Sequence, residues 1–390
     1  MITDRQGGVG EAAVGAPGQH HGVSSALPPR TVVWNAFNGR YADNPRALHE
    51  GLLARGLDES AGWQHVWMAD PRHASAFPEG VRTVPIRSAA CAEALASADA
   101  VVANCHVTLD PWPVGRPVRY LQTWHGTPLK RIHRSAASLP AEDVLAELDT
   151  DISRWDALVT PSPEATRLLR EAFAFDGEVL ETGYPRNDVL SAPDAAERRS
   201  AVRAQLGILE GATAVLLAPT YRDDEANGSG DLPLGFDVPE LLDALGDDVV
   251  LVLRLHYYVA DRLTLSRDPR VIDASRHPDV AELYLAADAL VTDYSSSMFD
   301  FAVTGRPVVL YAYDLDRYRD VLRGFTFDLR SEGPGPLLTQ PHELAEALGD
   351  LPGVSAAFTE QYAAFQRRWV SLEDGHATDR VLDAFFGPVA

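Results

Sequence analysis

The residues best suited to chemistry stand in the segment QTWHGTPLK, directly after an apolar run. His125 carries an imidazole, which titrates near neutral pH and can accept a proton from a hydroxyl group. Gly126 lets a ligand approach the backbone. Thr127 before Pro128 predicts the cap of a helix whose N-terminus attracts anions. The segment therefore predicts a site for an anionic ligand, and the alternative is a well-capped surface helix.

Lys130 closes this segment and is the only lysine among the 34 lysine and arginine residues. Its ammonium is a compact point charge that the planar fork of arginine does not replace. In the first turn of the predicted helix it would reinforce the attraction for phosphate. The alternative is a compositional bias that left one lysine by chance.

Two basic residues end a second apolar run, at 249–255. If the chain stays extended there, Arg254 and His256 point to the same side and present a guanidinium and an imidazole together. The alternative is that one of them packs against a neighbouring carboxylate.

A polar segment also follows the apolar run at 289–292. Asp293 leads into Ser295, Ser296 and Ser297, which are expected to open a helix and to offer hydroxyls and backbone N–H groups to an anion. The alternative is an ordinary helix cap, since aspartate and serine favour that position.

Two further loops complete the candidate site: APTYRDDE with Thr220 and Arg222, and GYPRND with Arg186. Together with Lys130 and Arg254, these arginines predict a local positive pocket for the phosphates of a nucleotide derivative. Neither G-x-G-x-x-G nor G-x-x-x-x-G-K-[ST] is present, which disfavours NAD-linked chemistry and NTP hydrolysis. The acidic run in APTYRDDE does not predict a metal site because consecutive side chains diverge. A transferase with an activated donor, without metal or cofactor, is expected.

The elements that must position these loops alternate between short apolar strands and helices, as in doubly wound parallel sheets. The expected strands lie at 31–34, 66–68, 100–103, 118–122, 157–159, 214–218, 249–255, 289–292 and 307–310. The expected helices lie at 43–55, 89–97, 163–173, 238–245, 280–287, 296–304 and 341–348, with a stretch at 356–386 broken near 374–375. Residues 191–200 fit either a linker or the start of a helix.

The fold class predicted is α/β, with two Rossmann-like doubly wound domains facing a cleft. The expected divisions are a disordered leader at 1–29, an acceptor-side domain at 30–190, a donor-binding domain at 191–365 and a final helix at 366–390 that crosses back to the first domain.

Composition narrows the function further. A net charge of −22 repels phosphodiester backbones and anionic lipid, so nucleic acid is not an expected partner. Cys91 and Cys105 are the only cysteines and lack metal-ligand spacing, which favours a reducing cytosol. No apolar stretch approaches the roughly 20 residues of a membrane span, and no secretory signal pattern is found. A cytoplasmic protein is expected.

The motifs resemble those of the CDP-glycerol glycerophosphotransferase family, the teichoic-acid primases and polymerases. The resemblance covers roughly residues 31–330 and runs through these segments in the order of the family: FNG with NP at 44–45, QTWHGTPLK, GYPRND, APTYRDDE, LRLHY, DVAELYLAADALVTDYSSS, YDLDRYRD and RGFTFD.

The resemblance implies a GT-B fold and metal-independent transfer of glycerol phosphate from CDP-glycerol to a hydroxyl of a glycerophosphate-bearing or lipid-linked acceptor. It implies work at the cytoplasmic membrane face, with peripheral membrane contact, although this chain shows no basic amphipathic anchor. The motifs do not separate primases, polymerases and ribitol-using relatives.

Within that family reading, His125 is the expected general base. Arg254 and His256 would stabilise the phosphate and the departing CMP, and the three serines would cradle the pyrophosphate. Asp293 would orient the loop or a glycerol hydroxyl. The rival readings are a GT-B glycosyltransferase that uses a nucleotide sugar and a catalytically silent nucleotide-binding relative. The joint presence of His125, His256 and Lys130 argues against the silent relative.

Overall fold

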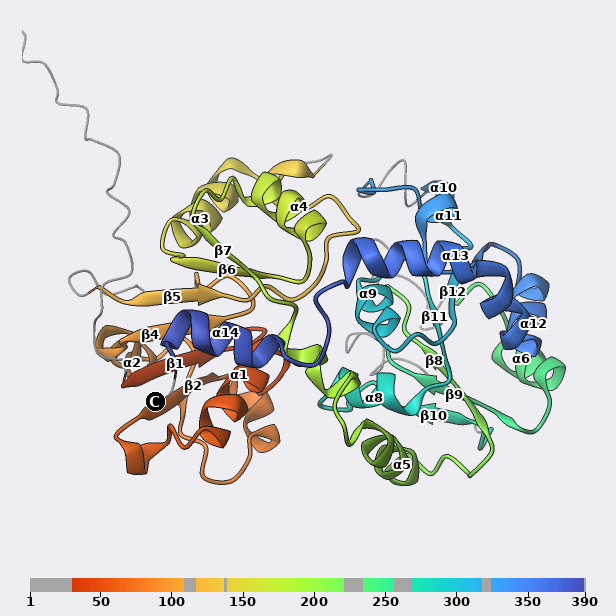
Figure 1. Ribbon diagram of the computed structural model, residues 1–390, viewed down its shortest axis with the longest axis horizontal. Helices are drawn as coiled ribbons and strands as arrows, with labels where there is room; N and C mark the ends of the chain where they lie inside the picture. Colours follow the sequence, from red (N-terminus) through yellow and green to blue (C-terminus); the bar gives the residue numbers. More distant parts are fainter. Residues whose placement is uncertain are drawn as a thin grey trace, which may run out of the picture.

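The computed structural model describes residues 30–108, 117–136, 139–220, 234–255, 268–317 and 324–388. The predicted leader at 1–29, Arg222 with the acidic run that follows it, and His256 lie outside the described residues. The described chain forms two lobes, each built around one parallel sheet (Figure 1).

The first lobe contains a sheet of seven strands in the order β3-β2-β1-β4-β5-β6-β7 within the described residues. Its strands are β1 (Thr31–Asn35), β2 (Gln64–Ala69), β3 (Thr83–Pro85), β4 (Ala100–Ala103), β5 (Arg119–Gln122), β6 (Ala157–Thr160) and β7 (Glu178–Glu181). Both faces are covered: Val32 and Trp34 pack on one side, whereas Val33 packs on the other. Burial on both faces explains why these strands read as continuous apolar runs.

The second lobe repeats this design, with the described strands in the order β10-β9-β8-β11-β12-β13. They are β8 (Thr213–Leu217), β9 (Val249–Leu253), β10 (Val271–Asp273), β11 (Ala289–Thr292), β12 (Val308–Tyr311) and β13 (Leu337–Leu338). In both sheets the order reverses beside the first strand, between β1 and β4 and between β8 and β11. Ligands of such sheets bind outside the carboxyl ends of the strands at these switch points.

The helices cover the sheets and link the lobes. Those of the first lobe are α1 (Asp43–Ala54), α2 (Ala89–Ser97), α3 (Glu142–Ile152) and α4 (Pro163–Phe173), with 3-10 turns η1 (Glu59–Ala61), η2 (Pro71–Ala76), η3 (His133–Ser135) and η4 (Pro185–Leu190). Then follow α5 (Ala195–Gln205), α6 (Val238–Leu245), α8 (Val280–Ala286), α9 (Ser297–Ala302), α10 (Leu315–Arg317), α11 (Leu329–Glu332), α12 (Pro341–Gly349), α13 (Leu351–Trp369) and α14 (Ala377–Phe386). The ambiguous segment at 191–200 thus enters a helix, α5.

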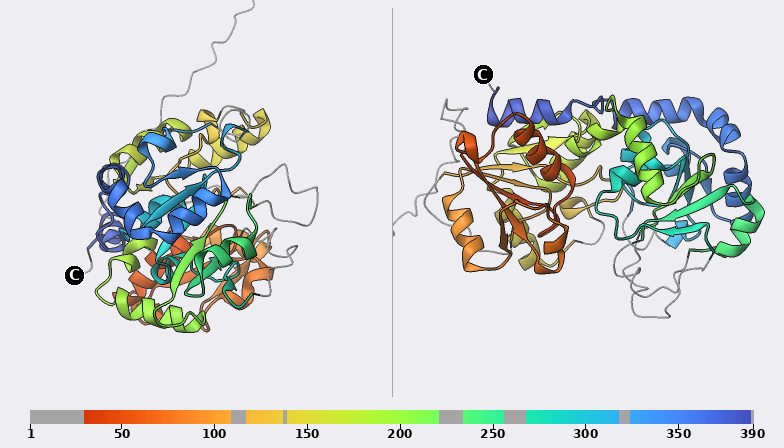
Figure 2. Two further views of the ribbon diagram at one scale, coloured as in Figure 1. Left: turned by 90° about the vertical axis from the view of Figure 1, so that its right-hand side faces the viewer. Right: turned by 90° about the horizontal axis from the view of Figure 1, so that it is seen from below.

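The last two helices run along one side of both lobes (Figure 2). Helix α13 lies on the second lobe, where Phe365 and Trp369 pack against Phe299. Its start is five residues earlier than expected because Asp350 accepts a hydrogen bond from the Gly353 N–H at 2.9 Å and caps it. Helix α14 lies on the first lobe and packs on α1. The architecture is the two-lobed parallel α/β arrangement expected from the sequence, of GT-B type.

Candidate active site

His125 lies in the loop after β5 and is held by the loop after β4. Its Nδ1 lies 2.5 Å from the carbonyl oxygen of Asn104. Because a carbonyl can only accept, the imidazole donates through Nδ1, and Nε2 is left as the proton acceptor. Burial lowers the pKa of His125 from its ordinary value of 6.5, although the hydrogen bond to Asn104 opposes this shift. The imidazole is therefore neutral at pH 7 and able to serve as a base.

The loops around His125 adopt backbone conformations that side chains rarely take. Phe37 (φ 46°), Asn38 (φ 54°), Asp43 (φ 62°) and Trp124 (φ 51°) all lie in the left-handed region. Such residues cost of order 1–3 kcal/mol each and cluster at functional sites. Phe37 also packs its ring against the imidazole of His125, with centroids 5.6 Å apart. The first lobe thus holds its histidine with strained loops at the switch point.

The predicted helix at Thr127 is wrong. Thr127 is buried, and the chain continues without helix to Lys130, which forms an antiparallel bridge with Phe325 of the second lobe. The N–H of Thr326 donates to the carbonyl of Leu129 at 2.8 Å. Pairing with a distant segment therefore takes the backbone groups that a helix would have used, and Lys130 does not lie at a helix start.

The serine loop faces His125 from the second lobe. Asp293 is buried, and its Oδ1 accepts the N–H of Thr220 at 2.8 Å, which joins the loops after β8 and β11. The hydroxyl of Ser295 lies 3.0 Å from that of Ser297. A β-carbon added to Gly126 would lie 2.8 Å from the Ser296 hydroxyl oxygen. The structure thus brings together the two loops that the sequence singled out.

Arg254 directly follows β9, and its guanidinium is partly engaged in hydrogen bonds. Nη1 donates to the carbonyl oxygens of Ala274, Ser275 and His277, at 3.0, 2.9 and 2.5 Å. Arg254 therefore fixes the loop after β10. Within the described residues its hydrogen-bond partners are these carbonyl oxygens, and no ion pair with a carboxylate is found. The side chain is partly exposed.

Arg186 is buried between the two lobes. Its Nη1 lies 3.1 Å from Asp43 Oδ2, and its Nη2 lies 2.9 Å from Asp300 Oδ1. Burial opposes its charge, but the carboxylates of Asp300 and Asp43 raise the pKa of Arg186 well above its usual value. Its charge is already balanced by these two carboxylates in this structure, so Arg186 does not stand open to a phosphate.

Asn44 extends this ion-pair chain to the loop that carries His125. Its side-chain oxygen accepts the backbone N–H of Arg186 at 3.1 Å, and its side-chain amide donates to the carbonyl of Trp124 at 3.1 Å. Asp300 on α9 is thereby connected to the residue before His125. The sequence analysis missed Asp43, Asn104 and Asp300 as site residues. Only Asn104 carried a signal, because it directly follows a buried strand.

The described residues contain neither a metal-binding cluster nor a membrane-spanning helix. Over the described ranges, no group of three or more His, Cys, Asp or Glu residues is arranged to hold a metal ion. Within that same part of the chain, no helix is long and apolar enough to span a bilayer.

The sequence of this chain is similar to those of known proteins along nearly its whole length. Residues 20–387 match the family model of CDP-Glycerol:Poly(glycerophosphate) glycerophosphotransferase. A teichoic acid glycerol-phosphate transferase of Staphylococcus aureus is 37% identical over 375 residues, covering 93% of this chain and 94% of that protein. A teichoic acid poly(glycerol phosphate) polymerase of Bacillus subtilis is 33% identical over 377 residues, which is 93% of this chain but 50% of that protein.

Among solved structures, the wall teichoic acid polymerase TagF superposes with a TM-score of 0.83 at 33% identity, over 92% of this chain and 89% of that one. Variants of TagF in which a histidine is replaced have also been solved, one of them after soaking with CDPG.

Proposed function

Because the chain belongs to the CDP-glycerol:poly(glycerophosphate) glycerophosphotransferase family, we propose that it transfers glycerol phosphate from CDP-glycerol to an acceptor in teichoic acid synthesis. The acceptor supplies a hydroxyl of a glycerophosphate-bearing or lipid-linked molecule, and CMP is released. The observation that carries the proposal is the neutral imidazole of His125, with Nδ1 tied to Asn104, placed beside the serine loop of the facing lobe.

The reaction needs a group that accepts the proton of the hydroxyl, groups that stabilise the negative charge of the phosphates, and in-line positioning of the two substrates. Nε2 of His125 takes the proton of the acceptor hydroxyl, and the hydroxyl oxygen attacks the phosphorus that carries glycerol. A new P–O bond forms while the bond to the CMP phosphate breaks, and CMP departs with the electron pair. Holding both partners in line supplies much of the acceleration.

The donor phosphates are assigned to the second lobe. The hydroxyls and N–H groups of Ser295, Ser296 and Ser297 hold the pyrophosphate, and Asp293 keeps their loop beside Thr220. Arg254, Arg222 and His256 stabilise the charge that develops on the departing CMP. Gly126, Thr127 and Lys130 form the facing wall. Arg186 does not contact the donor directly. It positions these loops through its ion pairs with Asp43 of the first lobe and Asp300 of the second.

The decisive experiment measures CMP release by the purified protein from CDP-glycerol, with and without an acceptor that carries glycerol phosphate. Acceptor-dependent CMP release, with lengthening of the acceptor by glycerol phosphate, is expected. CDP-ribitol and a UDP-sugar serve as matched donors. Turnover of the UDP-sugar with no turnover of CDP-glycerol would overturn the proposal in favour of a glycosyltransferase, and binding without any turnover would favour a silent relative.

A lipid-linked acceptor would place the protein at the cytoplasmic membrane face. Flotation with vesicles tests this point. Association only with vesicles that contain the acceptor is expected, since a chain of net charge −22 is repelled by anionic lipid. Equal binding to acceptor-free anionic vesicles would contradict it.

A further inference from the structure

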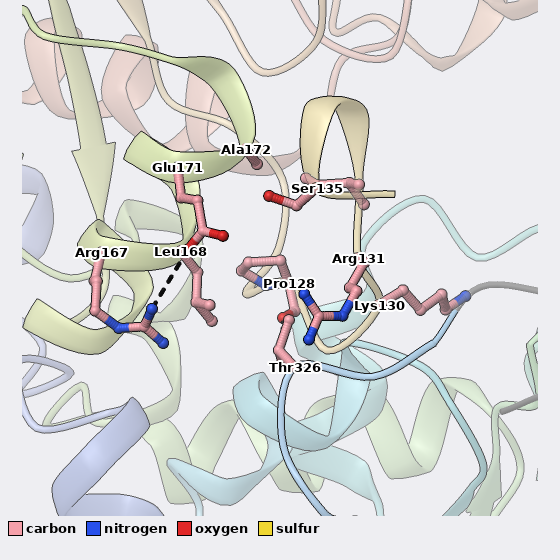
Figure 3. A pocket seen from close by; sticks show the side chains of 10 residues that line it. Pro128, Lys130, Arg131, Ser135, Arg167, Leu168, Glu171, Ala172 and Thr326 are labelled. Atoms are coloured by element: carbon pink, nitrogen blue, oxygen red, sulfur yellow. Dashed lines mark hydrogen bonds and ion pairs between the residues drawn. The ribbon is translucent and has the colours of Figure 1, made fainter. Parts of the chain in front are cut away.

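A pocket of about 190 Å³ lies between the lobes, next to the catalytic loop (Figure 3). We call it the interlobe pocket. Its walls come from the loop at 128–135, from α4 and from Thr326 of the second lobe. The hydroxyl of Thr326 donates to the carbonyl of Pro128 at 2.9 Å, and the N–H of Arg131 donates to the carbonyl of Gly324 at 3.3 Å. The second lobe therefore contributes Thr326 to a pocket whose other walls belong to the first lobe.

The polar groups of this pocket have mixed character. The guanidinium of Arg131 lies beside Pro128 and Thr326, while the side chain of Lys130 points away (Figure 3). Arg167 stands on the other side, where it pairs with Glu164 at 2.9 Å and with Glu171 at 3.5 Å. The hydroxyl of Ser135 also points into the space between them. Two guanidinium groups, one hydroxyl and one carboxylate are thus gathered in a chain that is otherwise strongly acidic.

This set of groups fits a polyol phosphate. Guanidinium groups bind phosphate oxygens through charge-assisted, often paired hydrogen bonds. A carboxylate accepts the hydrogen bond of a sugar-alcohol hydroxyl, and a serine hydroxyl can donate or accept. A simple polyanion would gain nothing from Glu171, whereas a unit that carries both a phosphodiester and a free hydroxyl uses all four groups.

The position of the pocket is suited to the acceptor. Pro128 follows His125 by three residues, so their Cα atoms are at most about 11 Å apart. We propose that the interlobe pocket binds a glycerol-phosphate unit already present in the acceptor, next to the terminal unit whose hydroxyl reacts. This inference rests on the proposed function and adds to it a second binding subsite for the acceptor. Acceptors with several phosphodiester units occupy this subsite and are therefore used better than acceptors with one unit.

The test compares two acceptors, one carrying a single glycerol phosphate and one carrying several. Arg131→Gln removes a charge at an exposed position. It should raise KM for the longer acceptor about ten-fold, the loss expected for a charge-assisted hydrogen bond. KM for CDP-glycerol, kcat, and KM for the short acceptor should stay unchanged. Arg167→Gln should act in the same direction. Arg198→Gln is the matched control, because Arg198 lies on α5 away from the pocket and is paired with Asp194, which precedes that helix.

Three outcomes overturn the inference. The first is an unchanged KM of Arg131→Gln for the longer acceptor. The second is an equal loss with both acceptors, which would place Arg131 at the transfer step. The third is an equal loss in Arg198→Gln, which would show a general effect of net charge. Failure of the wild-type protein to use any acceptor refutes the proposed function instead, and binding of the labelled longer acceptor without donor then tests the pocket by itself.

Discussion

Gly126 and Ser296 touch across the two lobes, so that a β-carbon on Gly126 would lie 2.8 Å from the Ser296 hydroxyl oxygen and 3.1 Å from its β-carbon. This contact sets the distance between the histidine loop and the serine loop. It also explains why the glycine suits this position: the requirement is close approach, since its backbone is not in the left-handed region.

The contact predicts the effect of Gly126→Ala. The serine hydroxyl must rotate away and the loops must separate by a few tenths of an ångström. We expect kcat/KM to fall about ten-fold, less than the roughly 10²-fold cost of a 1 Å misplacement, with little change in melting temperature. Adding Ser296→Gly removes the clash, so the double variant should be no worse than Ser296→Gly alone. Additive losses in this double-mutant cycle would contradict the contact.

His125→Ala should lower kcat by roughly 10²–10⁴-fold, as expected for the loss of a general base. Binding of CDP-glycerol, measured by calorimetry, should persist because the donor phosphates are assigned to the other lobe. His376→Ala, on an exposed histidine before α14, is the control and should keep full activity. Near-normal turnover of the His125 variant would show that His125 is not the general base.

The pH profile tests the protonation state of the same residue. Burial lowers the pKa of His125 below its ordinary 6.5, so the neutral form persists into mildly acid solution. Activity requires that form and is lost as pH falls through the lowered pKa. The acid limb of kcat/KM against pH should therefore show an apparent pKa below 6.5. A limb above 7 would mean that His125 is not the base.

Arg186→Met should destabilise the protein strongly, because it leaves the carboxylates of Asp43 and Asp300 facing each other without a cation. Breaking a buried ion pair in this way costs about 3–5 kcal/mol of unfolding free energy. Arg198→Met, which removes an exposed pair with Asp194, should cost less than about 1 kcal/mol. Denaturant unfolding of both variants measures this difference in unfolding free energy. Similar small losses in both would show that the ion pairs of Arg186 do not stabilise the contact between the lobes.

Glu373 predicts a pH-dependent stability. Burial raises the pKa of Glu373 to about 8, from an ordinary value of 4.5. Between these values the native state holds a proton that the unfolded chain has released, so stability falls as pH rises through this window, by on the order of 4 kcal/mol. Glu373→Gln should remove this component from the unfolding free energy between pH 5 and pH 8.5. The exposed Glu346→Gln should keep the wild-type slope, and a Glu373 variant with that same slope would count against the prediction.

Local patterns were enough to predict much of the fold. Helix α4 has the bounds expected from its apolar spacing, and the structure shows Ser162 capping it and Pro163 starting it. The strands were found because burial on both faces makes them apolar throughout. The polar residues that follow them marked the site, since parallel strands end at one edge of a sheet.

Long-range pairing accounts for what could not be predicted. Thr127 and Pro128 have the local chemistry of a helix start, but Phe325 and Thr326, almost two hundred residues later, bind this backbone instead. The sequence predicts Arg186 as a phosphate ligand. The residues next to Arg186 in the sequence do not show that Asp43 and Asp300 enclose its guanidinium. Both positions lie at the junction of the lobes, where segments distant in the sequence decide the structure.

The return of α14 to the first lobe has a consequence for biosynthesis. Val381, Leu382 and Phe385 complete the apolar cluster that also contains Val32 and Trp34 of β1. During translation the first lobe leaves the ribosome early, yet part of one apolar face of its sheet stays uncovered until residues 377–386 have emerged. The lobe made first is therefore finished last, and in the interval a nascent chain exposes the surface that chaperones bind.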